Sequence, residues 1–122
     1  MKKRNILVKF VWKAKNNYKN LKKSVSNEKT KEINNSFNKQ LLNSIHHQFE
    51  RIKIKFPIGN PIPKKLIPKE LKKFGITTLY HSKLTQGWRM LYSIFRGDKK
   101  NEVMCVVVFI GDHKAYNKLM GY

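Results

Sequence analysis

Apolar positions in the first half of the chain change their period. Residues 5–11 (NILVKFV) are mostly apolar, and Ile6, Val8 and Phe10 share one face at a period of two, which predicts a short strand. The spacing then becomes helical, and Ser26-Asn27 offers the end of a first helix and the N-cap of a second. The apolar positions of the two helices are Ala14, Tyr18, Leu21 and Val25, then Ile33, Phe37, Leu41, Ile45, Phe49 and Ile52. This pattern predicts a helical hairpin that covers a sheet.

The second half of the chain has the pattern of strands. All four prolines lie from Pro57 to Pro68, so we expect an ordered, extended crossover there rather than a helix or an inner strand. Three strand-like segments follow with short turns between them, which predicts an antiparallel meander; they are residues 76–84, 88–96 and 103–110. The last is apolar throughout, so it should be covered on both faces. Asp112 can cap a short helix that runs to Leu119 and ends at Gly121.

Together these elements predict an α+β fold in one domain, residues 1–122. It has one N-terminal strand, a two-helix hairpin, a three-stranded antiparallel meander that completes a four-stranded sheet, and a short C-terminal helix. The length suits one domain, and a hydrophobic share of 40% suffices for a modest core. No apolar run is long enough to span a membrane, and the apolar stretch after the basic N-terminus ends at Lys9, too early for a signal peptide. We therefore expect a cytoplasmic protein with no membrane partner.

The charge balance changes the picture most. Lys and Arg number 27 against 7 Asp and Glu, which gives a formal net charge of +20. Such a field attracts polyanions, and nucleic acid bound through its phosphates is the expected partner. Genomes rich in A and T, or hot environments, also favour lysine, but both normally raise glutamate as well. The basic residues are spread over both halves, so the whole fold is cationic. A polybasic membrane-surface role is the weaker alternative.

Several kinds of chemistry are absent from the sequence. It has no glycine-rich phosphate loop, no HExxH or CxxC motif and no Gly-x-Ser-x-Gly. The single cysteine, Cys105, lies in an apolar strand and is interpreted as a core residue. The few scattered carboxylates do not predict a two-metal nuclease site, and we expect no metal or other cofactor. A phosphodiester would have to be cut by His, Lys, Arg and Tyr side chains.

The meander supplies such side chains. His81 and Lys83 are two residues apart in one strand and share a face, and Arg89 begins the next strand after a short turn. An arginine among apolar neighbours favours an anion as its partner. The end of the last strand should return to this region and bring His113 into the same patch. Taken singly, His81 is more simply an exposed strand residue, and Lys83 is one lysine among many.

Other candidates lie close to these in the sequence. Lys114 and Tyr116 follow His113, although His113 and Tyr116 could equally be ordinary residues of a helix start. Trp88 and Tyr80 are aromatic side chains that could stack on bases. Lys114, Trp88 and Tyr80 are therefore the substrate-binding candidates.

Two segments of the second half resemble a known family. Residues 87–92 (GWRMLY) are similar to the Gly-aromatic-Arg-hydrophobic-hydrophobic-Tyr segment of RelE/ParE-superfamily toxins of type II toxin–antitoxin systems. Residues 106–116 (VVVFIGDHKAY) resemble the last strand of that family, which runs into a glycine, basic residues and a tyrosine. The order of strand, helical hairpin and meander also fits. The resemblance implies a RelE-like fold over most of the chain.

The RelE-like branch implies a function. Its members are mRNA interferases, metal-independent endoribonucleases that cut mRNA in the ribosomal A site and inhibit translation. The RNA 2′-hydroxyl attacks the adjacent phosphate and leaves a 2′,3′-cyclic phosphate. The implied partners are mRNA, the ribosome with its rRNA, and a cognate antitoxin protein. By position, the resemblance implies catalytic roles for His81, Lys83, Arg89, His113 and Tyr116.

Some assignments stay open. His81 stands where a lysine is common in the family, and the chain lacks the sheet glutamate that some relatives use as a base. The base is therefore either His81 or His113, with the other as the acid. A ParE-like gyrase inhibitor would share the fold without needing these residues, and a non-catalytic basic nucleic-acid-binding protein would need only the charge.

Overall fold

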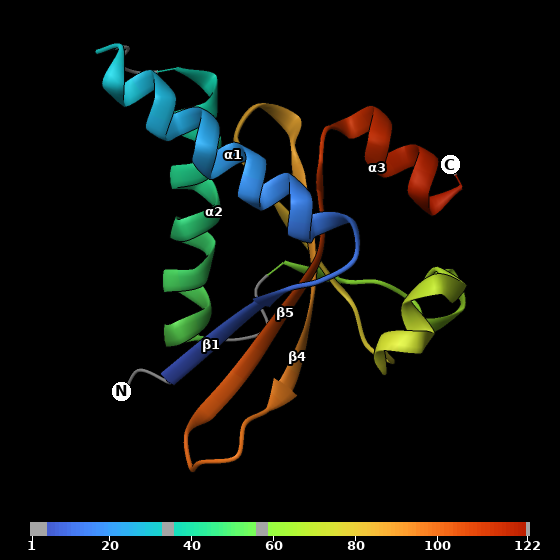
Figure 1. The fold of residues 1–122 in the computed structure, drawn as a ribbon. Helices are drawn as coiled ribbons and strands as arrows, with labels where there is room; N and C mark the ends of the chain where they lie inside the picture. The colour runs from blue at the N-terminus through green and yellow to red at the C-terminus, as the bar shows by residue number, and fades with distance from the viewer. Residues whose placement is uncertain (1–4, 33–35, 56–58, 122) are drawn as a thin grey trace.

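The fold is built on one mixed β-sheet, seen in a computed structural model that describes residues 5–32, 36–55 and 59–121 (Figure 1). The five strands lie in the order β1-β5-β4-β3-β2, with β1 parallel to β5 and the other neighbours antiparallel. The elements are β1 (Asn5–Phe10), α1 (Lys13–Thr30), α2 (Phe37–Ile54), β2 (Asn60–Pro61), η1 (Lys64–Leu66), η2 (Lys69–Phe74), β3 (Tyr80–Lys83), η3 (Thr85–Gly87), β4 (Arg89–Arg96), β5 (Glu102–Gly111) and α3 (His113–Met120).

The α+β class and the antiparallel meander of β3, β4 and β5 are confirmed, but the sheet has five strands rather than four. The extra strand, β2, is two residues long and pairs Pro61 with Tyr80 at the edge of the sheet. Proline has no N–H to donate, so an edge is where a strand can hold it. The next residue continues the contact, because the Ile62 N–H donates to the Leu79 carbonyl at 2.8 Å.

The helical hairpin forms as predicted, but its helix boundaries differ. The predicted break at Ser26-Asn27 is wrong, because α1 continues to Thr30, whose hydroxyl donates to the Ser26 carbonyl at 3.1 Å. Ser and Asn cost a helix only a fraction of a kcal/mol each, too little to end one that packs on a sheet. The second helix begins after Ser36, whose hydroxyl oxygen accepts the Lys39 N–H at 3.1 Å. Ile33, placed on the second helix, lies outside the described residues.

The segment between α2 and β3 is more turned than predicted. Pro63 and Pro68 precede the 3₁₀ turns η1 and η2, so the crossover is not extended throughout; residues 56–58 lie outside the described part. Proline suits the start of a helical turn, where no N–H is needed. Strand β3 is shorter than the predicted 76–84 because Ile76 and Leu79 pack in a core beside η2 instead of pairing in the sheet.

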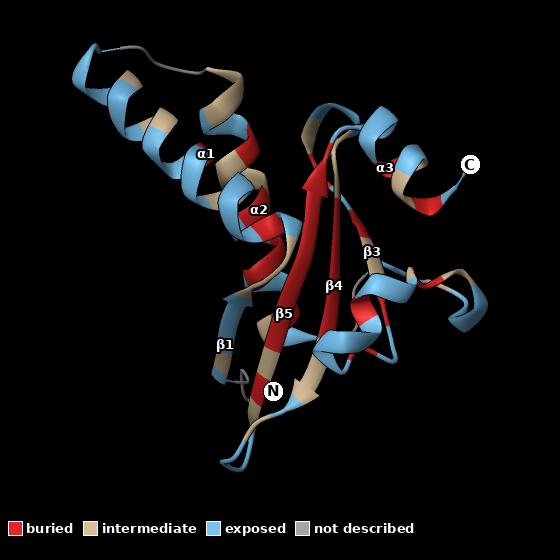
Figure 2. Cartoon of the chain, turned by 45° about the vertical axis from the view of Figure 1, so that its right-hand side comes forward, coloured by how far each residue is buried: buried red, intermediate tan, exposed pale blue. Residues whose placement is uncertain are grey.

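Both faces of the sheet are covered (Figure 1). The pair α1 and α2 packs on one face, in a core that includes Ile45, Tyr92 and Val107. The helix α3 and the turn η2 cover the other face, in a core that includes Leu91 and Val108. Strand β5 contributes to both cores and is buried along most of its length (Figure 2). The prediction that this strand is covered on both sides is confirmed.

The two long helices are amphipathic. Ala14 and Leu21 of α1 and Leu41 and Ile45 of α2 are buried, whereas the lysines of α1 are exposed. Burial of these side chains, rather than helix propensity, holds the hairpin on the sheet. Across the described ranges, no helix has the length and apolar character needed to cross a membrane.

A β-bulge interrupts the pairing of β4 with β5. Leu91 lies opposite Phe109, but Tyr92 lies opposite Val107, so Val108 is an extra residue on β5. Val108 and Phe109 consequently both contribute to the α3-side core. A bulge redirects the side chains that follow it. Here it turns Phe109 over Gly111, where an added Cβ would lie 2.5 Å from the Phe109 ring.

Candidate active site

Three chemically active side chains share the α3 face of the sheet. Lys83 on β3 lies directly opposite Arg89 on β4, and His81 lies opposite Leu91. Leu91 belongs to the core under α3, which fixes the face that its cross-strand neighbours share. Tyr116 of α3 packs on this group, with its ring 5.0 Å from that of His81. We call His81, Lys83, Arg89 and Tyr116 the His81 cluster.

The turn between β3 and β4 holds the two basic side chains side by side. Gln86 and Gly87 both have positive φ, 52° and 81°, and reverse the chain within a few residues. Glycine adopts such angles without steric cost, and a glutamine does so only when its surroundings hold it. The Thr85 N–H donates to the Ser44 hydroxyl of α2 at 3.0 Å, which anchors the turn to the helical hairpin.

His81 is the best candidate for a general base. Burial, together with the nearby charges of Arg89 and Lys83, lowers the pKa of His81 below its usual value of about 6.5. Its Nε2 atom is buried and makes no hydrogen bond to any described residue. The Tyr116 ring stacks on it at an interplanar angle of 24° and restricts its rotation. The imidazole is therefore neutral at pH 7 and able to accept a proton.

The two basic side chains of the cluster have no carboxylate partners. Within the described residues, neither Lys83 nor Arg89 forms an ion pair, although Arg89 is only half exposed. A guanidinium that is partly removed from water favours an anion that accepts two hydrogen bonds. The arrangement thus suits a phosphate group. No three His, Cys, Asp or Glu side chains of the described part gather to hold a metal ion.

Of the three candidate site residues on α3, one, Tyr116, lies in the His81 cluster, and the other two are exposed to solvent. The Asp112 carboxylate accepts the Ala115 N–H at 2.8 Å and caps the helix, as predicted. Tyr116 is buried against His81, whereas His113 and Lys114 are exposed on the first turn. His113 precedes Tyr116 by three residues, which places the two on neighbouring turns. Within the described residues, no ring contact or hydrogen bond joins His113 to the cluster.

The aromatic candidates Tyr80 and Trp88 point to the other face of the sheet. Tyr80 stacks on Tyr92 with a ring separation of 5.6 Å, on the side of α1 and α2. Trp88 packs there against Phe37, with ring centroids 5.4 Å apart. The structure therefore does not bring Tyr80 to the His81 cluster, because adjacent residues of a strand point to opposite faces. The same rule, applied to the sequence, already separates Tyr80 from His81.

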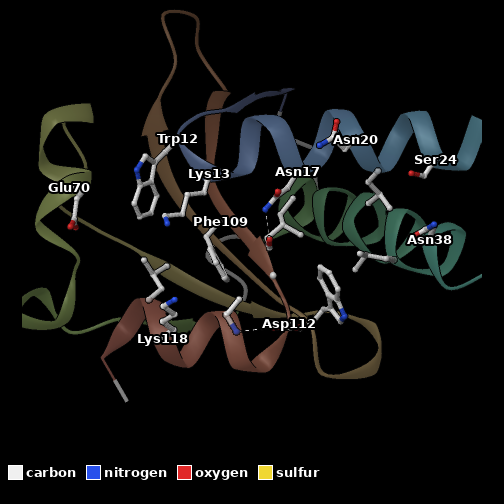
Figure 3. A pocket seen from close by; sticks show the side chains of 17 residues that line it. Trp12, Lys13, Asn17, Asn20, Ser24, Asn38, Glu70, Phe109, Asp112 and Lys118 are labelled. Carbon is white, nitrogen blue, oxygen red and sulfur yellow. Dashed lines mark hydrogen bonds between the residues drawn. The ribbon is translucent and has the colours of Figure 1, made fainter.

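A groove of about 760 Å³ opens at the end of β5, between α1 and α3 (Figure 3). Strand β5 continues past the end of β1, and the Asn17 side chain of α1 donates to the Ile110 carbonyl at 3.0 Å. Phe109 lies at the centre of the view, with Lys13 from α1 above it and Lys118 from α3 below it. Sequence reasoning missed this groove, apart from Trp88. In the sequence, the one indication of this groove is Trp12, an aromatic residue directly after the predicted first strand.

The fold and the site together define an α+β protein with a cationic cluster around a neutral histidine and a groove beside it. No protein-family model matches the chain, and neither does any curated protein or solved structure. The function is inferred below from the side chains of the cluster and from the charge of the molecule.

Proposed function

We propose that this chain is the toxin of a type II toxin–antitoxin system and acts as a metal-independent endoribonuclease, an mRNA interferase of the RelE-like kind. One observation carries the proposal: His81, Lys83 and Arg89 share a face of the sheet, and the two basic groups have no acidic partner among the described residues. The net charge of +20 favours RNA as the substrate. The resemblance of residues 87–92 and 106–116 to RelE-like toxins supports the same reaction.

The reaction needs a base, a group that stabilises negative charge and an acid. His81 takes the proton of the RNA 2′-hydroxyl, whose oxygen then attacks the adjacent phosphorus. Arg89 donates two hydrogen bonds to the phosphate oxygens, and Lys83 adds a second positive charge as the phosphorane forms. The bond from phosphorus to the 5′-oxygen breaks, which leaves a 2′,3′-cyclic phosphate and a 5′-hydroxyl.

The departing 5′-oxygen needs a proton. His113 is the candidate acid because an imidazole can donate a proton and because His113 is exposed on the turn before Tyr116. Tyr116 holds the His81 ring in place by stacking. Lys114, exposed next to His113, adds a contact to the RNA backbone.

The expected setting is the bacterial or archaeal cytoplasm. There the chain would enter the ribosomal A site, bind rRNA through its lysines and cut the mRNA codon by codon. A cognate antitoxin would block this action by covering the His81 cluster. Such an antitoxin needs acidic side chains, because it must pair with a strongly cationic surface.

The test is to induce the chain in cells and map the ends of mRNA. Wild type should produce 5′-hydroxyl and 2′,3′-cyclic phosphate ends, and Arg89→Ala should reduce the rate of cleavage roughly 10²–10³-fold. Arg96→Ala is the matched control, since Arg96 lies exposed at the far end of the same strand. Uncut mRNA with stalled replication would indicate a gyrase inhibitor instead. RNA binding without toxicity would indicate a non-catalytic protein.

A further inference from the structure

The groove between α1 and α3 differs in charge from the rest of the molecule. Two basic residues, Lys13 and Lys118, and two acidic residues, Glu70 and Asp112, line it. These are two of only 7 acidic residues in a chain with a net charge of +20. The groove is therefore close to neutral, in contrast to the His81 cluster, whose two basic groups pair with no carboxylate of the described residues. A phosphate fits the cluster, and an uncharged group fits the groove.

The lining of the groove offers hydrogen-bonding groups that the fold does not use. The side chains of Asn20, Ser24 and Asn38 make no hydrogen bond to described residues, and Asn17 uses its amide N–H₂ but not its oxygen. An amide carries both a donor and an acceptor, which is the pattern on the edge of a nucleobase. Such side chains bind an uncharged heterocycle with fixed orientation.

Aromatic rings are available for stacking in the same groove. Trp12 and Trp88, both half-buried, line it, and the buried Phe109 forms part of its wall. Lys13 Nζ lies over the Trp12 ring, 5.1 Å from its centre, and both residues line the groove. Bases of single-stranded RNA stack on such rings, at about 1–3 kcal/mol per base by alanine substitution.

The groove adjoins the His81 cluster directly. Gly111 lines the groove and is the cross-strand neighbour of Arg89, so the two sites meet at one residue pair. Phe109 forms the wall between them, because its ring lines the groove and lies 6.4 Å from the ring of Tyr116. A phosphate at Arg89 and a base in the groove are therefore within reach of one nucleotide.

We propose that the groove binds the base of a single-stranded RNA nucleotide whose phosphate lies at Lys83 and Arg89, and that it selects among bases. This inference rests on the proposed RNA-cleaving function and adds the part of the substrate that is recognised. An acidic protein segment fits the groove less well, since Glu70 and Asp112 offset Lys13 and Lys118 and leave no excess positive charge for it to pair with.

Tryptophan fluorescence gives a direct test, because both tryptophans of the chain line the groove. In Trp88→Phe, Trp12 is the single reporter. Titration with each of the four ribonucleoside 3′-monophosphates should change the Trp12 emission until binding saturates. The four dissociation constants obtained in this way should differ. Ribose 5-phosphate, which has no base, should compete through the cluster without the same change in emission.

Paired variants locate the site. Asn20→Leu should weaken nucleotide binding by about three- to tenfold, the value of one hydrogen bond, and change the order of the four bases. Asn16→Leu is the matched control on the same helix, because Asn16 is exposed and does not line the groove. Arg89→Met should weaken the nucleotides and ribose 5-phosphate alike.

The outcomes separate this inference from the proposed function. If RNA is cut but no nucleotide changes Trp12 emission, the groove is not the base site, and the nuclease function stands. If the four nucleotides bind with different affinities but no RNA is cut, the inference about the groove stands, and the nuclease function fails. Emission that responds to poly-glutamate and not to nucleotides would overturn the inference in favour of a protein partner.

Discussion

At the scale of single residues, burial and two neighbouring charges make His81 the candidate base of the proposed reaction. A histidine on an open sheet face would be partly protonated near pH 6.5. His81 is instead partly buried and lies near the positive charges of Arg89 and Lys83. Burial and both charges lower its pKa. His113 is exposed to solvent. The two imidazoles, equivalent in the sequence, are thus different in the fold.

This difference predicts a specific pH profile. If His81 is the base, as proposed, its neutral form is the reactive one, and the acid limb of the cleavage rate should have its midpoint below pH 6.5. Lys83→Met removes one of the charges that oppose protonation, so the pKa of His81 rises and the midpoint moves to higher pH. The measurement is single-turnover cleavage of a short RNA from pH 4.5 to 8. Lys100→Met, in the loop between β4 and β5, should leave the midpoint in place; an equal shift in both variants would contradict the assignment.

At the scale of elements, one buried hydrogen bond ties the site strand to the helical hairpin. Ser82, between the two reactive residues of β3, donates to Gln48 of α2 at 2.9 Å, and both side chains are buried. This bond fixes which face of β3 turns toward α2. It therefore also fixes the direction of His81 and Lys83 toward α3.

Removing only one of the two hydrogen-bonding side chains should destabilise the fold more than replacing both with apolar side chains. Ser82→Ala leaves the Gln48 amide buried without a partner and should lower the free energy of unfolding by about 1–3 kcal/mol. The double variant Ser82→Ala, Gln48→Leu should recover much of that loss, because neither polar group is then left unpaired. Urea unfolding of the two variants checks this. Equal losses in both would mean that the bond does not hold β3 in place.

Elements and site could be predicted wherever the signal is local. The helices follow from their apolar period, and the grouping of His81, Lys83 and Arg89 follows from strand alternation across a short turn. The bulge at Val108 could not be predicted, because an unbroken apolar run has no period to reveal a register shift. The groove could not be predicted either, since its walls come from opposite ends of the chain, such as Trp12 and Leu119.

At the scale of the whole molecule, the charge should act as one field. In the proposed function, the net charge of +20 attracts RNA of any sequence, and the His81 cluster and the groove position one nucleotide of it. The proposal thus assigns affinity and base selectivity to different parts of the surface. Replacing exposed lysines should therefore change the affinity for RNA without changing the selectivity among bases.

The salt dependence of binding separates the two contributions. The logarithm of the affinity for single-stranded RNA should fall linearly with that of salt concentration, with a slope of about −0.7 per phosphate contacted. Lys83→Gln should make the slope shallower by about that amount, because it removes one phosphate contact. Asn20→Leu should weaken binding without changing the slope. The check is fluorescence anisotropy of a labelled oligonucleotide between 50 and 300 mM salt; a slope that Lys83→Gln leaves unchanged would place Lys83 away from the RNA.

The pairing of β1 with β5 also determines when the molecule can become active. Asn5 lies opposite Glu102, so the first strand to emerge during synthesis waits for the last one before it can enter the sheet. Tyr116, whose ring stacks on His81, follows β5 in the chain and is made later still. A nascent chain that has not yet extended past α3 therefore has neither a paired β1 nor the ring that packs on His81.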